Sequence, residues 1–149
     1  MASKFEFSKA LMRDFPLLRN YQITSPDSPE YNCIAWAAAD VEQWWWPSAD
    51  PYQYWPPGVP KKATLAAFQA AFGTLGFEPC PDDSLELEFE KVALFADDAS
   101  RITHAARQLP NGKWTSKMGL SHDIEHVLAE MEGGKYGRVI GYMRRRRSA

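Results

Sequence analysis

The sequence predicts a single α+β domain over residues 1–149, with N-terminal helices packed on an antiparallel sheet. The first observation is composition, since 149 residues that are 45% hydrophobic and 13% aromatic suit one folded domain with one core. The second is order, because helix signals dominate the first half of the chain and short strand-like runs the second. The third is the turn signals between those runs, which favour antiparallel pairing.

The helices are predicted from capping residues and apolar spacing. Ser8, Asn32 and Thr64 are good N-caps, and each precedes a helix-favouring segment. A further stripe of Ile124, Val127, Leu128 and Met131 recurs at helical spacing after Ser121. The predicted helices are 8–15, one that begins at Cys33, 65–75 and 123–131, and residues 20–29 between the first two are expected to be turn-like.

The strands follow from short apolar runs bounded by turn residues. They are predicted at 89–96, 102–109, 113–118 and 138–143. Pro110 and Gly112 favour a three-residue hairpin loop in which Leu109 faces Lys113. In that register one face of the sheet carries His104, Gln108, Trp114 and Ser116, and the other carries Arg107, Lys113, Thr115 and Lys117.

An aromatic, proline-rich segment lies between the helices. It runs from Trp44-Trp45-Trp46-Pro47 to Pro60 and contains Trp55, and its prolines forbid a helix or a central strand. Two interpretations stay open. The rings close over the core as a satellite cluster, or they form a wall that contacts a substrate.

Cys33 and His104 are the candidate chemical pair. A helix that begins at Cys33 puts its thiol near unpaired N–H groups, which favour the thiolate. The alternatives are a buried small hydrophobe for Cys33 and a hydrogen-bonded core residue for His104. Cys80 lies between two prolines and is interpreted as structural. A cysteine with a histidine is the minimum for thiol catalysis, in which one group attacks and the other handles the proton.

Two segments carry a resemblance to known families. Asn32-Cys33 at a helix start, followed by 104–116 (HAARQLPNGKWTS), resembles the core of papain-like, NlpC-type cysteine peptidases and amidases. The resemblance implies Cys33 as nucleophile, His104 as base and Ser116 as the residue that orients the base, with Gln108 as a substitute. Those enzymes commonly have Asp where this chain has Asn32, and His, Asn or Gln where it has Ser116. The whole chain also resembles a bacterial domain family of undetermined function with YNCIAW, WWWP and HAARQL patterns.

The expected activity is that of a thiol hydrolase or transferase acting on an amide or thioester bond of a small-molecule or peptide-like substrate. The alternative is a non-catalytic module whose cleft, walled by aromatic residues, recognises a protein partner. The residues expected to contact the substrate are Asn32, Trp36, Trp45, Trp46, Trp55, Gln108 and Trp114.

Other classes of function are disfavoured. His122-Asp123-Ile124-Glu125-His126 matches an inverted zincin pattern, but a capped helix start and the lack of a clear third ligand argue against zinc, and no metal or cofactor is expected. A net charge of -2 gives no pull toward nucleic acid, and Arg144–Arg147 is expected to be a solvated tail. Without a signal core or a membrane-length apolar run, the chain is expected to be cytoplasmic, although export that needs no such signal stays open.

Overall fold

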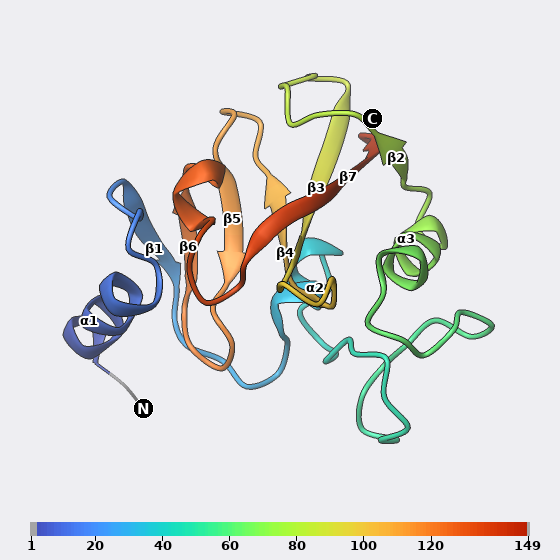
Figure 1. Ribbon diagram of the computed structural model, residues 1–149, viewed down its shortest axis with the longest axis horizontal. Coiled ribbons are helices and arrows are strands. Elements are labelled where there is room, and N and C mark those ends of the chain that lie inside the picture. The colour runs from blue at the N-terminus through green and yellow to red at the C-terminus, as the bar shows by residue number, and fades with distance from the viewer. Residues whose placement is uncertain (1–2, 149) are drawn as a thin grey trace.

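The computed structural model describes residues 3–148, which form a seven-stranded antiparallel sheet flanked by helices (Figure 1). The strand order is β1-β6-β5-β4-β3-β7-β2. The α+β class predicted from the sequence is therefore confirmed. The helices are α1 (Lys4–Asp14), α2 (Cys33–Ala37), α3 (Leu65–Gly73) and a 3-10 helix (Leu128–Met131); the strands are β1 (Tyr21–Ser25), β2 (Glu78–Cys80), β3 (Phe89–Ala96), β4 (Ile102–Gln108), β5 (Trp114–Lys117), β6 (Asp123–His126) and β7 (Arg138–Arg146).

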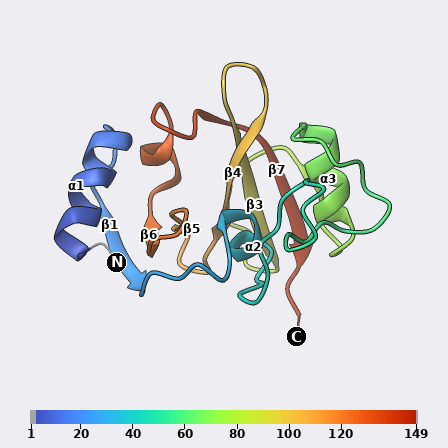
Figure 2. The same ribbon diagram turned by 90° about the horizontal axis from the view of Figure 1, so that it is seen from below.

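Hydrophobic clusters cover both faces of the sheet. Alternate residues of β3 point to opposite sides, so Val92 and Leu94 join the cluster around α2 and α3, while Ala93 and Phe95 join the cluster beneath α1. Figure 2 shows α1 and α3 at the two ends of the molecule, with α2 between them. A site can therefore form on either side of the central strands.

The hairpin between β4 and β5 has the predicted register. Arg107 pairs with Thr115, and the Leu109 N–H donates to the Lys113 carbonyl at 2.7 Å. Gly112 has φ +88°, the left-handed conformation that the three-residue loop requires. Pro110 and Gly112 determine the type of this turn. The turn then sets the register of β4 and β5, and therefore which side chains share a face of the sheet.

The predicted helix over 123–131 is wrong. Residues Asp123–His126 form strand β6, which pairs with β1 on one side and β5 on the other, and only Leu128–Met131 turns as a 3-10 helix. Val127, assigned to the inner stripe, is exposed. Over so short a run the apolar spacing is compatible with a helix or a strand. Hydrogen bonds to β1 and β5 stabilise the strand.

The N-terminal assignments also need correction. Helix α1 begins at Lys4 and is capped by Ser3, whose hydroxyl accepts from the Glu6 N–H at 3.1 Å, so Ser8 lies inside the helix. The segment expected to be turn-like contains β1, an edge strand whose half-buried residues alternate with exposed ones. Strand β1 was not predicted because its partner β6 was assigned to a helix, which left β1 without a strand to pair with.

The arginine run is a strand and not a solvated tail. Strand β7 continues to Arg146, and Arg144 donates two hydrogen bonds to Glu86 at 2.8 and 2.9 Å. Arg145 pairs with Glu90 and lies over the Phe77 ring. The charges of the run are matched by acidic residues that precede and begin β3.

Candidate functional site

Asn32 caps α2 as predicted and also holds the aromatic segment. Its Oδ1 accepts from the N–H groups of Ala35 and Trp45, both at 3.1 Å, and its Nδ2 donates to the Trp45 carbonyl at 2.7 Å. These bonds are buried, so both polar atoms of the side chain already bond within the chain. Asn32 therefore fixes Cys33 and the aromatic segment relative to each other.

The thiol of Cys33 is buried, with 9% of the residue exposed. Burial raises its pKa to about 11, although the N–H groups of Ala105, Ile34 and Cys33 itself and the positive charge of Lys117 act in the opposite direction. The resting group is therefore a thiol at neutral pH. A base must take its proton before or during any attack by the sulfur.

A chain of three buried side chains lies on the α1 side of the sheet, where Ser116 bridges two histidines. Ser116 Oγ lies 2.9 Å from His104 Nε2 and 2.7 Å from His126 Nε2. His126 Nδ1 lies 3.0 Å from the Val127 carbonyl and must be its donor. The hydroxyl of Ser116 then donates to the bare Nε2 of His126 and accepts from the Nε2–H of His104.

This assignment leaves His104 with one free nitrogen. His104 Nδ1 is buried and has no hydrogen-bond partner within residues 3–148. The Tyr136 ring stacks on the imidazole at 4.1 Å between centroids, and the Phe95 ring meets it edge-on at 5.2 Å. The imidazole is thus fixed in position with an unused acceptor.

Both bridged histidines are neutral at physiological pH. Burial, with a smaller contribution from the charge of His126, holds the pKa of His104 well below its ordinary value. Burial likewise lowers the pKa of His126 to about 4. A protonated imidazole at either position would therefore be a strong acid that readily gives its proton away.

Cys33 lies against the strand that carries His104. The N–H that acts most strongly on its sulfur belongs to Ala105, the residue after His104. Within residues 3–148 the sulfur makes no hydrogen bond with the His104 imidazole, whose Nε2 is paired with Ser116. The structure thus brings His104 and Ser116 into the predicted contact on the α1 side of the sheet. Cys33 lies in the cluster around α2 on the other side, without the thiol–imidazole bond that catalysis requires.

A cavity of about 380 Å³ opens beside Cys33. Of the residues expected to contact a substrate, Asn32 and Trp46 line it, and Trp44 of the same aromatic run does too. Sequence reasoning missed its remaining lining residues, which come from four separate segments: Gln53, Thr103, Gly119 and Tyr136.

The other expected contact residues are held elsewhere by identified bonds. Trp36 Nε1 donates to Thr115 Oγ1, Trp45 Nε1 to Asp40, and Trp55 Nε1 to the Pro60 carbonyl. Trp114 lies in the cluster beneath α1, and Gln108 Nε2 donates to the Asp83 carbonyl. Trp45 and Trp55 therefore close over the core, while Trp44 and Trp46 line the cavity, and their contact with a substrate stays a prediction.

Neither histidine of the zincin-like pattern lies on a helix, since His126 ends strand β6 and His122 directly precedes that strand. His122 Nδ1 lies 3.0 Å from the Ser25 carbonyl, and His126 Nε2 accepts the hydrogen bond from the Ser116 hydroxyl. Over residues 3–148 no group of three or more His, Cys, Asp or Glu side chains is placed to hold a metal ion. In the same part of the chain no helix has the length and apolar character needed to cross a membrane.

Comparison with known proteins identifies a family. No curated protein and no solved structure matches the chain. A family model described as a domain of unknown function, DUF7689, matches residues 22–144, which hold nearly all of the sheet together with α2, α3 and the aromatic segment. The chain therefore belongs to the DUF7689 family.

Proposed function

We propose that this domain is a thiol hydrolase or transferase with a papain-like arrangement, which acts on amide or thioester carbonyls. The observation that carries the proposal is the state of His104. Its Nε2 is fixed by Ser116 at 2.9 Å, its Nδ1 is free, and the next peptide N–H acts on the Cys33 sulfur. An oriented base with one open nitrogen and a cysteine packed against the same strand are two parts that thiol catalysis needs, and a movement that brings the sulfur to His104 Nδ1 completes the site.

The reaction begins with a neutral pair. As Cys33 Sγ forms a bond to the substrate carbonyl carbon, its proton moves to His104 Nδ1 and the carbonyl π electrons move to oxygen. When the tetrahedral intermediate collapses, the bond to the leaving group breaks and the imidazolium returns the proton to that group. Because burial depresses the pKa of His104 and raises that of the Cys33 thiol, the first transfer is uphill and must accompany bond formation to the carbonyl, whereas the second is favourable. Water or another acceptor then releases the acyl group from the sulfur.

A second function is favoured by the burial of the thiol. Cys33 is nearly closed off, and burial raises its pKa to about 11, as expected for an inert core cysteine. In this alternative the cavity walled by Trp44 and Trp46 recognises a ligand without chemistry. The two functions differ in how the sulfur reacts.

Alkylation by iodoacetamide separates them. Labelling of Cys33 in Cys80→Ser protein is compared at pH 6.5 with labelling of Cys80 in Cys33→Ser protein, by mass spectrometry. The proposal expects Cys33 to react at least tenfold faster than the more exposed Cys80, because His104 accepts its proton as the bond forms. His104→Gln, checked for folding by circular dichroism, should remove that advantage. A Cys33 rate below that of Cys80, rising only near pH 11, contradicts the proposal and favours the binding module.

A further inference from the structure

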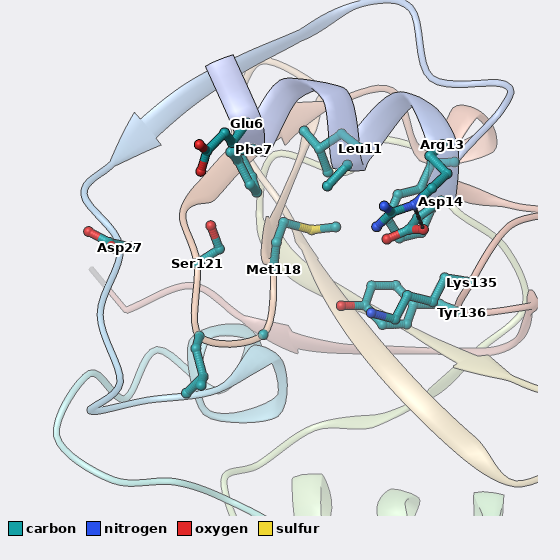
Figure 3. A pocket seen from close by; sticks show the side chains of 14 residues that line it. Glu6, Phe7, Leu11, Arg13, Asp14, Asp27, Met118, Ser121, Lys135 and Tyr136 are labelled. Carbon is teal, nitrogen blue, oxygen red and sulfur yellow. Dashed lines mark hydrogen bonds and ion pairs between the residues drawn. The ribbon is translucent and has the colours of Figure 1, made fainter. Parts of the chain in front are cut away.

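A second and larger cavity lies beneath α1 on the other side of Tyr136 (Figure 3). Its volume is about 550 Å³, within the range of small-molecule sites. Phe7 and Leu11 of α1, Met118 and Leu120 after β5, and the Tyr136 ring supply its apolar walls. Sites for small molecules combine such walls with a few polar groups that fix orientation.

The cavity also has polar and charged lining residues, which are Glu6, Arg13, Asp14, Asp27, Ser121, Lys135 and the Tyr136 hydroxyl. Arg13 Nε donates to Asp14 at 3.0 Å, so these two charges satisfy each other at the rim. Figure 3 shows the Tyr136 hydroxyl beneath Met118, on the side of the cavity away from α1. Within the described part of the chain this hydroxyl has no hydrogen-bond partner, so it is free to donate to a ligand.

The cavity adjoins the one that holds Cys33. Gly119 and Tyr136 line both spaces, and they are the boundary between them. Tyr136 also stacks on His104, so the same ring contacts the imidazole and both cavities. A substrate with its reacting carbonyl at Cys33 therefore has the cavity beneath α1 as its neighbour across Tyr136 and Gly119.

We propose that the cavity beneath α1 binds the aliphatic acyl chain of a thioester substrate whose carbonyl lies at Cys33. This inference rests on the proposed function and names its substrate class. An acyl chain fits the lining because it has no hydrogen-bonding groups beyond its carbonyl. A peptide in the same space brings a donor and an acceptor with each residue, and these need partners that apolar walls do not give.

Binding is tested without catalysis in full-length Cys33→Ala protein, with butyrate, octanoate and decanoate as probes in isothermal titration calorimetry. We expect affinity to rise about fourfold for each methylene that the cavity buries, so that decanoate binds far more tightly than butyrate. Ala10→Trp, on the cavity wall, should weaken decanoate binding at least tenfold. Met12→Trp is the matched control, since Met12 lies on the same helix with 63% of the residue exposed.

A second variant guards against misfolding of Ala10→Trp. Leu120 lines the mouth and is 64% exposed, so Leu120→Asp places a carboxylate there without disturbing the core and should also weaken decanoate binding. Failure of decanoate to bind, or equal binding to Ala10→Trp, Leu120→Asp and Met12→Trp proteins, overturns the inference.

Turnover of butyryl and decanoyl N-acetylcysteamine thioesters by protein with Cys33 intact separates this inference from the proposed function. Binding of decanoate with cleavage of neither thioester supports the acyl site and contradicts the thiol chemistry. Cleavage of both thioesters at equal rates, without decanoate binding, keeps the chemistry and overturns the acyl site. Preferred cleavage of the decanoyl thioester, lost in Ala10→Trp and kept in Met12→Trp, supports both.

Discussion

Ser116 and Lys117 are neighbours on β5, and both are completely buried, yet they meet the cost of burial in different ways. Ser116 faces the α1 side and joins two histidines that burial keeps neutral. Lys117 faces the other side, where its Nζ donates to the carbonyls of Ser28, Gly119 and Ser121 at 2.8, 2.7 and 2.6 Å.

The two environments differ in how easily they can adapt. A neutral chain of imidazoles and a hydroxyl can be re-paired by a change of tautomer. The ammonium of Lys117 has three donors, each with its own carbonyl, and it lies over the Tyr31 ring. We therefore infer that the face with the neutral chain is suited to proton transfer and the face with the cation is suited to holding the loop after β5 in place.

Removal of the cation should have the largest effect on stability. Lys117→Met leaves three carbonyls without their donor, and we expect the free energy of unfolding to fall by about 4 kcal/mol. Urea denaturation at pH 7 measures this change. Lys113→Met, at an exposed position of the same hairpin, is the control and should change stability by less than about 0.5 kcal/mol. A loss for Lys117→Met no larger than the control's contradicts the role of the cation.

The neutral chain should make the fold sensitive to acid. Burial lowers the pKa of His126 from 6.5 to about 4, against the opposing effects of the Val127 carbonyl, Glu130 and Glu125. Between these values the unfolded chain binds a proton that the native state does not, so stability falls as the pH drops. The expected loss from His126 alone is about 3 kcal/mol between pH 6.5 and pH 4, and His104 adds to it in the same direction.

The acid sensitivity is measured by urea unfolding of the wild-type protein and of His126→Gln at pH 7, 5.5 and 4.5. The variant should lose less stability than the wild type over this range, because one of the buried imidazoles is gone. An identical pH dependence in the two proteins shows that His126 is not held neutral by the fold.

Loss of the bridging hydroxyl should have the smallest effect. Ser116→Ala removes the partner of both histidines and leaves two buried but neutral imidazole nitrogens unpaired, so we expect a loss of about 2 kcal/mol. Nitrogen-15 NMR of the imidazoles in the wild type should show His126 with its proton on Nδ1 and His104 with its proton on Nε2. The opposite tautomers in the wild-type protein contradict the donor assignments, and Ser121→Ala is the control for stability.

Local chemistry explains which parts of the site could be predicted. Asn32 as the N-cap of α2 and Gly112 in the hairpin loop are choices made within a few residues of the chain. The hairpin register then placed His104 with Ser116 across two strands, and this contact was predicted from sequence. His126 was missed because its segment was assigned to a helix, and Tyr136 because a short segment between glycines gives no sign of where its ring points.

Capping residues, turn residues and apolar spacing by themselves determined the α+β class, the starts of α2 and α3, strands β3 to β5 and the register between β4 and β5. Only the tertiary structure decided that residues 123–126 form a strand, that the arginines of β7 pair with glutamates, and that two cavities meet at Tyr136 and Gly119. The physical reason is range, since capping and turn bonds join residues within a few positions of each other. Strand pairing, ion pairs and cavity walls join residues far apart in the sequence, and no local pattern records those partners.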